Sequence, residues 1–449
     1  MTPEQPNRSR GTRRGWAMRR LIRVLVGGSV LALLVDTWLV EGLLAPVIVA
    51  SGSMAPALLG PHRQWRCARC SHDFDCGLES LPAPGVAAVC PNCGAENDAE
   101  QGVDRHGDRV FVDRSAFLWR SPRRWEAVVF RCPDEPDTLC IKRVVGLPGE
   151  RVQIQQGDVF VDGTIAQKDL ALGRAMAVRV YDTPDLDQRW QPRSPGAWQA
   201  IGARFVHPGR IEKPGGKRYQ RSRSPRVIDW LTYHHQQRFV GGERSGPILD
   251  ESPCDQNESR ELTAVADITL RCEIQATGTG TIVLRADARA DEFVLRLDVV
   301  TGEGELLHNG RATALIAAPL DPFGGFARLE LIVADRRVQL ALNKSLLLEY
   351  DYQPADNPAP FAGSIEARSA EQPLAIGVQE AEVEIRHLQI FRDIYYTAGS
   401  AQATQTSFQL GPDEYFLLGD NSPHALDSRV WSPRGGLRGT LLVGSVLAW

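Results

Sequence analysis

Regular alternation of apolar and polar residues predicts a mainly β protein after the first fifty residues of this chain. Runs with every second residue apolar recur between short polar turns, as at residues 268–274, 281–285, 293–299 and 327–333. Successive side chains of a strand point to opposite faces, so this pattern is typical of strands with one buried face. Helical periodicity is scarce beyond the N-terminal segment. We therefore expect a mainly β fold class.

The predicted strands form two groups. Short strands at 109–112, 127–130, 143–146, 152–154, 159–161 and 415–418, with a hairpin turn at Asp162-Gly163, flank a longer body. That body, residues 172–401, has evenly spaced strands and predicts a β-sandwich. Its strand pattern resembles concanavalin-like or laminin-G-like jelly rolls. Residues 441–449 are too short to span a membrane and predict a final buried strand.

The N-terminal segment predicts a membrane anchor. Six arginines and one glutamate occupy the first twenty residues, and an apolar run then extends from Leu21 to Val35, broken by Arg23, and resumes at Trp38. A span needs about 20 mainly apolar residues. Arginines on the near side place the N-terminus in the cytoplasm and the rest of the chain outside. A cleaved secretory signal is the alternative, but cleavage near Ala50 would cut into the functional block described below.

Overall charge does not favour binding to nucleic acid. The 449 residues carry a formal net charge of −4. A basic stretch between Arg204 and Arg226 could contact anionic lipid headgroups. A solvated loop is the simpler interpretation of that stretch.

Two cysteine pairs predict a structural zinc ribbon. The pairs are Cys67-x2-Cys70 and Cys90-x2-Cys93. Two residues between cysteines allow both thiolates to reach one ion, and two such turns make a closed S4 site. A pair of disulfides is the alternative in an oxidising compartment.

The other cysteines leave several pairings open. The sequence has nine cysteines in total, an odd number. Cys76 is either a spare thiol or an alternative ligand. Pairing of Cys132 with Cys140 across a hairpin, and of Cys254 with Cys272, stays open from the sequence alone.

A serine and a lysine provide the candidate chemistry. Ser53 lies in the block Ser-Gly-Ser-Met-Ala-Pro at residues 51–56, and Lys142 opens the block Lys-Arg-Val-Val-Gly-Leu-Pro-Gly-Glu at residues 142–150. A serine hydroxyl needs a base within hydrogen-bond reach. A lysine has an ordinary pKa near 10.4, so it can act as that base only if burial favours its neutral form. Ile141 and Val144 provide apolar neighbours on a predicted strand.

A third block, residues 419–431, supplies the polar residues Asp420, Asp427 and Arg429. These side chains can form a charge-assisted network that fixes a loop beside the lysine.

The three blocks, in this order after an apolar segment, resemble those of bacterial type I signal peptidases, which are membrane-anchored Ser-Lys proteases. The resemblance covers about a third of the chain. It implies that Ser53 is the nucleophile and Lys142 the general base, and that the Ser51 hydroxyl and the Ser53 N–H form the oxyanion hole. Asp420, Asp427, Ser428 and Arg429 would form the supporting network.

The third block departs from the family pattern. Ala425 stands where the family has a serine that hydrogen-bonds the lysine, and Ser422 replaces an arginine. Orientation of Lys142 would then rely on Ser428, the backbone or water. Endoplasmic relatives use a histidine as base, but with Lys142 in its full motif we interpret His424 as a loop residue.

The resemblance implies a single-pass enzyme of the cytoplasmic membrane, with its catalytic domain on the extracytoplasmic side, that removes signal peptides from preproteins. It needs no cofactor for catalysis. A catalytically weak anchored protein whose sandwich binds glycan or cell-wall polymer is one alternative, and a self-cleaving repressor relative is another. The expected organisation is a basic N-terminus (1–20), an anchor (21–42), catalytic core parts (43–66, 105–171 and 402–449), a zinc ribbon (67–104) and an inserted sandwich (172–401).

Overall fold

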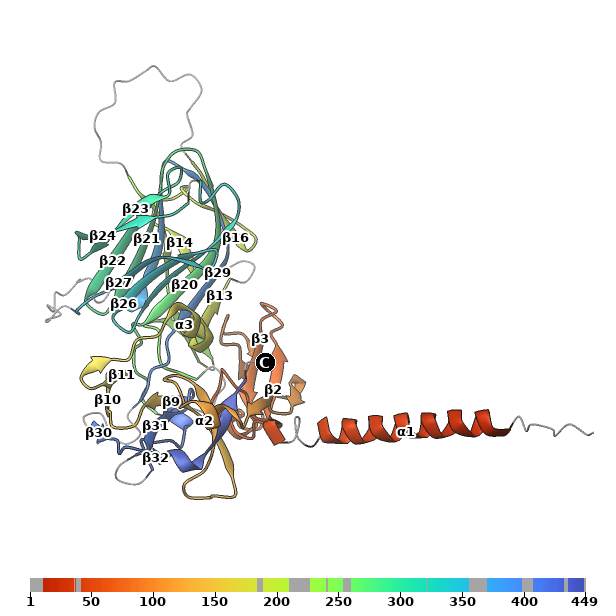
Figure 1. Cartoon of the computed structure of the whole chain (residues 1–449). Helices are drawn as coiled ribbons and strands as arrows, with labels where there is room; N and C mark the ends of the chain where they lie inside the picture. Colours follow the sequence, from red (N-terminus) through yellow and green to blue (C-terminus); the bar gives the residue numbers. More distant parts are fainter. Residues whose placement is uncertain are drawn as a thin grey trace, which may run out of the picture.

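The protein consists mainly of β-sheets that form two bodies and a small ribbon (Figure 1). The computed structural model describes residues 11–35, 37, 42–183, 189–209, 227–239, 241–252, 260–319, 321–354, 370–397, 407–431 and 435–447. This architecture confirms the mainly β fold class.

The lower body in Figure 1 contains a sheet that we call the core sheet, with strand order β1-β7-β33-β8-β9-β31-β32. Its strands come from both sides of the sandwich in sequence. The C-terminal strand β33 lies between β7 and β8, which confirms the predicted final strand. The bounds are β1 Leu44–Ile48, β7 Arg109–Asp113, β8 Ala127–Arg131, β9 Leu139–Gly146, β31 Glu414–Leu418, β32 Leu437–Arg438 and β33 Leu442–Val446.

A smaller sheet of order β12-β11-β10-β30 packs beside the core sheet. Val145 of β9 and Phe416 of β31 share a buried cluster with Val152 and Ile154 of β10. Asp162 and Gly163, both with positive φ angles, form the predicted hairpin turn between β11 and β12. The bounds are β10 Arg151–Gln155, β11 Asp158–Val161, β12 Thr164–Ile165 and β30 Ser407–Gln409.

The upper body in Figure 1 is a β-sandwich, as the alternation predicts. One sheet has the order β15-β16-β29-β20-β25-β26-β27, with β13 also paired to β29. Its bounds are β13 Val178–Asp182, β15 Gln199–Ile201, β16 Arg204–Pro208, β20 Ile268–Thr277, β25 Ala327–Ala334, β26 Arg337–Leu342, β27 Ser345–Asp351 and β29 Glu382–Arg392.

The second sandwich sheet has the order β14-β17-β28-β21-β22-β23-β24. Apolar side chains from both sheets, such as Leu270 and Leu284, fill one continuous core. The bounds are β14 Trp190–Pro192, β17 Asp229–Tyr233, β21 Thr281–Ala288, β22 Asp291–Asp298, β23 Glu303–His308, β24 Arg311–Ala317 and β28 Leu374–Gln379. A hairpin of β18 Gln236–Phe239 and β19 Gly242–Ser245 adjoins this sheet in sequence.

The cysteine-rich segment folds as a ribbon beside the core sheet. One part has the order β3-β2-β6 and the other pairs β4 with β5. The bounds are β2 His62–Arg66, β3 Asp73–Gly77, β4 Ala88–Val89, β5 Glu96–Asn97 and β6 Val103–Arg105, with short 3-10 helices η2 Leu78–Ser80 and η3 Ala99–Gln101.

A buried lysine joins the lower body to the sandwich. Lys168 donates to Asp335 Oδ1 at 2.9 Å and to Asp393 Oδ2 at 2.7 Å, and its ammonium lies 4.8 Å from the centre of the Trp125 ring. Helix α3 (Leu170–Met176) follows, and its Arg174 pairs with Glu330 of β25 at 2.7 Å. Charges buried in this way need partners, so these contacts fix the two bodies against each other.

The N-terminal helix α1 (Gly11–Val35) extends away from both bodies (Figure 1). Its apolar side chains from Leu21 to Val35 are exposed. No helix in the described part of the chain combines the length and the apolar character that crossing a bilayer requires. Residues 36 and 38–41 of the predicted anchor are outside the described set, and the anchor at 21–42 stays a prediction.

The structure contains one of the two cysteine pairings that the sequence left open. Cys132 and Cys140 form a disulfide across the β8–β9 connection. Cys272 is a buried free thiol of β20, whereas Cys254 lies outside the described residues. Most of the basic stretch, residues 210–226, is also outside them. Arg204 pairs with Glu384 of β29 at 3.1 Å.

Candidate active site

The loop after β1 carries Ser53. We call residues 50–59 the nucleophile loop. Backbone hydrogen bonds close its turns, from Ala55 N to Gly52 O at 3.0 Å and from Leu58 N to Met54 O at 2.9 Å. The Asp108 carboxylate, just before β7, accepts from Leu59 N at 2.7 Å and so fixes the base of the loop.

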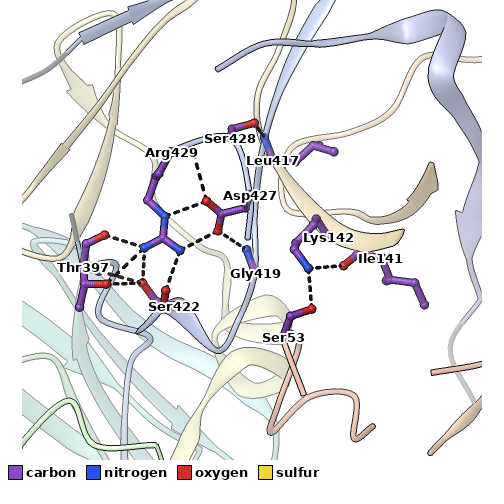
Figure 2. Close-up of polar contacts among 10 residues, drawn as sticks. All are labelled: Ser53, Ile141, Lys142, Thr397, Leu417, Gly419, Ser422, Asp427, Ser428 and Arg429. Carbon is purple, nitrogen blue, oxygen red and sulfur yellow. Dashed lines mark hydrogen bonds and ion pairs between the residues drawn. The ribbon is translucent and has the colours of Figure 1, made fainter. Parts of the chain in front are cut away.

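Lys142 points directly at this serine (Figure 2). It lies on β9 opposite Val128 of β8, which places it within the core sheet. Its Nζ is 2.5 Å from Ser53 Oγ and 3.1 Å from its neighbour's carbonyl, Ile141 O. Two residues separated by 89 positions thus share one hydrogen bond, a contact suited to proton transfer from hydroxyl to amine.

The surroundings of Lys142 favour its neutral form. The residue is only 4% exposed. Burial lowers the pKa of its amine from the ordinary value to about 8, while the charges of Asp427 and Asp420 oppose that shift. Desolvation therefore dominates over attraction here. A lysine with this pKa is neutral in about one molecule in ten at pH 7.

The Ser51 hydroxyl lies near the nucleophile. Ser51 Oγ donates to Ser53 Oγ at 3.3 Å. Its assignment, with the Ser53 N–H, to an oxyanion hole stays a prediction, because that role concerns an oxygen present only during reaction.

The third block follows β31 and reaches the lysine because β31 pairs with β9, with Leu418 opposite Arg143. Its acidic residues form separate ion pairs instead of the single expected network. Asp420 accepts two hydrogen bonds from Arg143, at 2.9 and 2.5 Å. Asp427, which is fully buried, pairs with Arg429 through Nε at 2.8 Å and Nη2 at 2.6 Å.

Ser428 does not hold the lysine among the described contacts. Its hydroxyl accepts from Leu417 N at 2.8 Å and so fixes β31 (Figure 2). Ala425 is buried where the family has a serine. Lys142 Nζ donates to Ser53 Oγ and to Ile141 O, so the backbone, one of the options that the sequence left open, helps to orient the amine. His424 is exposed, on the 3-10 helix η5 (Ser422–His424).

Several positioning residues were missed by the sequence reasoning. Asn421 donates through its side chain to Gly52 O at 3.1 Å and through its backbone to Ser53 O at 3.2 Å. Its place beside Asp420 in the third block was an available signal. Ser422 accepts from Arg429 at 2.7 Å and from Thr397 N at 2.8 Å (Figure 2). Thr397 lies five residues after β29, in the segment that leaves the sandwich, and no sequence motif indicated that it contributes to the site.

The four ribbon cysteines come together as the spacing predicts. Their sulfur atoms all lie within 4.8 Å of one another, with Cys67 to Cys93 at 3.5 Å and Cys70 to Cys90 at 3.7 Å. A tetrahedral zinc site with Zn–S near 2.3 Å has sulfur–sulfur edges of about 3.8 Å. All four are free thiols. Hydrogen bonds with Cys90 and then Cys93 lower the pKa of Cys70, whereas the hydrogen bond with Cys70 raises the pKa of both Cys90 and Cys93, so the proton is shared unequally within the cluster. The donor set fits a metal better than disulfides.

Comparison with known proteins links the middle of the lower body to peptidases. Residues 99–195, which include Lys142, match the family model described as signal peptidase, peptidase S26. A probable signal peptidase I-2 of Synechocystis sp. is 34% identical over 67 residues, which are 14% of this chain and 31% of the relative. Signal peptidase I of Leptolyngbya laminosa is 38% identical over 64 residues, 12% of this chain and 31% of the relative.

The chain spans between 19% and 44% of the length of the curated relatives that it matches. Among solved structures, the exoplasmic/lumenal domain of VIP36 in a Ca²⁺/Man3GlcNAc-bound form covers 47% of this chain and 87% of its own, at 11% identity and a TM-score of 0.29. The sequence matches show a partial similarity to signal peptidases, which includes the segment around Lys142.

Close approach at Gly419 gives a test of this packing. A Cβ there would lie 2.4 Å from the Ala425 Cβ and 2.5 Å from Ser53 O. Gly419→Ala should therefore force the loops apart and lower the free energy of unfolding by about 1–3 kcal/mol, measured as a lower midpoint of thermal unfolding. Gly173→Ala, which meets open space in α3, is the control. Equal midpoints for the two variants would contradict the packing described.

Proposed function

We propose that this protein is a serine endopeptidase of the signal peptidase type that uses a Ser-Lys dyad. The observation that carries the proposal is the 2.5 Å contact between Ser53 Oγ and a buried Lys142 amine. Taken with the peptidase S26 match around Lys142, this contact favours peptide-bond hydrolysis over a purely binding role. The substrates that we propose are preproteins cleaved after their signal peptides, with small residues one and three places before the scissile bond.

The proposed reaction follows from the two side chains. Neutral Lys142 accepts the Ser53 proton while Oγ attacks the substrate carbonyl carbon. The protonated amine then donates to the leaving nitrogen, and an acyl ester on Ser53 remains. Lys142 next takes a proton from water, which attacks the ester carbonyl carbon. The ammonium then gives that proton to Ser53 Oγ as the ester C–O bond breaks, which releases the product carboxylic acid and returns a neutral amine and a free serine. The Ser53 N–H and the Ser51 hydroxyl would stabilise the oxyanion, a contribution of a few kcal/mol per donor.

The proposed location is the cytoplasmic membrane, with the N-terminus inside and the catalytic body on the extracytoplasmic side. The arginines in the first half of α1 and the exposed apolar residues of its second half support this placement. The proposed metal is a structural Zn²⁺ held by Cys67, Cys70, Cys90 and Cys93, with no open position for catalysis.

The central test is cleavage of a preprotein in detergent. Ser53→Ala and Lys142→Ala should each abolish cleavage while the fold is retained, because each removes one partner of the proton transfer. Arg131→Ala, at the exposed C-terminal end of β8, is the control and should cleave at the wild-type rate. Cleavage by Lys142→Ala at that rate would refute the base assignment. An inactive wild-type protein that binds cell-wall polymer would favour the alternative of an anchored binding protein.

The pH dependence of cleavage should report the lysine. Only the neutral amine accepts the serine proton, so kcat/KM should rise with pH and level off above an apparent pKa near 8, the lowered value of Lys142. The measurement is kcat/KM from pH 6 to 10 with a substrate that lacks ionising groups near the cleavage site. A midpoint close to 10, as for a solvated lysine, would show that the amine is not desolvated.

The zinc prediction is tested by metal analysis. Protein purified without chelators should contain about one zinc per chain, as expected for a closed S4 site. Cys70→Ser should lose the metal, and Cys272→Ser, which removes a buried thiol of the sandwich, should keep it. Protein free of metal, with all four ribbon cysteines oxidised, would refute the site.

A further inference from the structure

The ribbon touches the nucleophile loop directly. Glu79, on η2, accepts a hydrogen bond from Gly52 N through Oε1 at 3.1 Å. Gly52 immediately precedes Ser53, and a Cβ at Gly52 would lie 3.0 Å from the same oxygen, so the carboxylate lies close against the loop. This acidic residue belongs to the cysteine-rich segment, outside the three catalytic blocks.

A short, stiff path runs from the cysteine cluster to this contact. β2 leaves the nucleophile loop and ends at Arg66, just before Cys67, and β3 returns in register with it, pairing His62 with Gly77. The end of the β2–β3 pair next to the nucleophile loop is fixed by a hydrogen bond from Leu78 N to Pro61 O at 3.0 Å. The Cys76 thiol donates to Ser80 O at 3.0 Å, which ties η2 to β3. The two arms therefore carry the first cysteine turn at one end and Glu79 at the other.

The second cysteine turn is attached to the sandwich instead. Asn92, between Cys90 and Cys93, is buried and exchanges two hydrogen bonds with the Asp182 backbone, at 2.8 and 2.9 Å. Arg189 donates to Asn92 O at 2.6 Å. An ion bound by all four thiolates would connect a turn anchored on the sandwich with a turn anchored on the nucleophile loop.

We propose that the ribbon is a metal-dependent positioning device for the nucleophile, with Glu79 as its contact residue. The inference rests on the proposed function, because it concerns the same serine. Metal at the four cysteines fixes the β2–β3 arms against the sandwich, and Glu79 then holds the Gly52 N–H. Asn421 of the third block donates to Gly52 O. With both peptide groups held, Ser53 keeps its place opposite Lys142.

Loss of the metal or of Glu79 should weaken this hold without removing it. The ribbon keeps other internal contacts, such as Trp65 Nε1 to Asp98 O at 3.1 Å. Glu79 is exposed, so its hydrogen bond contributes less than a buried one would. Misplacement of a nucleophile lowers the rate of the chemical step more than it lowers the affinity for the substrate. The expected signature is a fall in kcat with little change in KM.

The test compares Glu79→Ala with Glu79→Gln in the full-length protein. Glu79→Ala should lower kcat for preprotein cleavage by about threefold to tenfold, as expected for one lost hydrogen bond. Glu79→Gln keeps an oxygen that can accept from Gly52 N and should restore most of the rate. Glu100→Ala, on η3 of the same ribbon, is the control for a change of charge and should match the wild type.

The link to the metal is tested by chelation and zinc return. Chelation should lower the wild-type kcat by a similar factor, reversibly, and should add little in Glu79→Ala, because the path is already broken. An equal further loss in both proteins, or a Glu79→Ala rate equal to that of Glu100→Ala, would overturn the proposal.

A readout without cleavage separates this inference from the proposed function. Hydrogen exchange of the peptide that spans residues 50–59 should be faster in Glu79→Ala and in chelated wild type, with exchange in β20 of the sandwich unchanged. Faster exchange in a protein that cleaves no preprotein would support the role of Glu79 in positioning the loop and contradict the proposed peptidase function. Unaltered exchange in an active enzyme would do the reverse.

Discussion

Desolvation of one lysine amine is the physical condition on which the candidate site depends. Lys142 is enclosed because β9 lies between β8 and β31, and because Gly419 allows the third block to close over its side chain. An ammonium ion in such a place loses much of its hydration, and the neutral form gains in proportion. Both nearby carboxylates are already paired with arginines, which limits how strongly they can restore the charge. The ion pairs thus serve the amine indirectly.

Much of this arrangement could be predicted from local sequence. Alternation located the strands of both bodies, and the cysteine spacing located a cluster whose sulfur atoms meet. Ser53 and Lys142 were paired through the blocks that contain them, and the structure places them within hydrogen-bond distance. These features are readable because each depends on residues close together in sequence, or on a motif with a specific chemical requirement.

The contacts that sequence reasoning missed join segments that are far apart along the chain. These contacts are set by how the sheets and loops pack, and the sequence around one partner does not indicate the other. They join Arg143 to Asp420, Thr397 to Ser422, and Glu79 to Gly52. The sequence pattern predicted one network of Asp420, Asp427 and Arg429, whereas in the structure Asp427 pairs with Arg429 and Asp420 pairs with Arg143. A carboxylate pairs with the nearest cation in space, and for Asp420 that cation is on β9.

The buried joint at Lys168 also constrains what the sandwich can do. Its ammonium is shared by Asp335 on the sandwich and Asp393 on the returning segment, beside the Trp125 ring of the lower body. Hinge motion across this point would separate the buried ammonium from its carboxylate partners, which is unfavourable, so the two bodies should move as one rigid unit. Any molecule bound by the sandwich would therefore stay at a constant distance and orientation relative to Ser53.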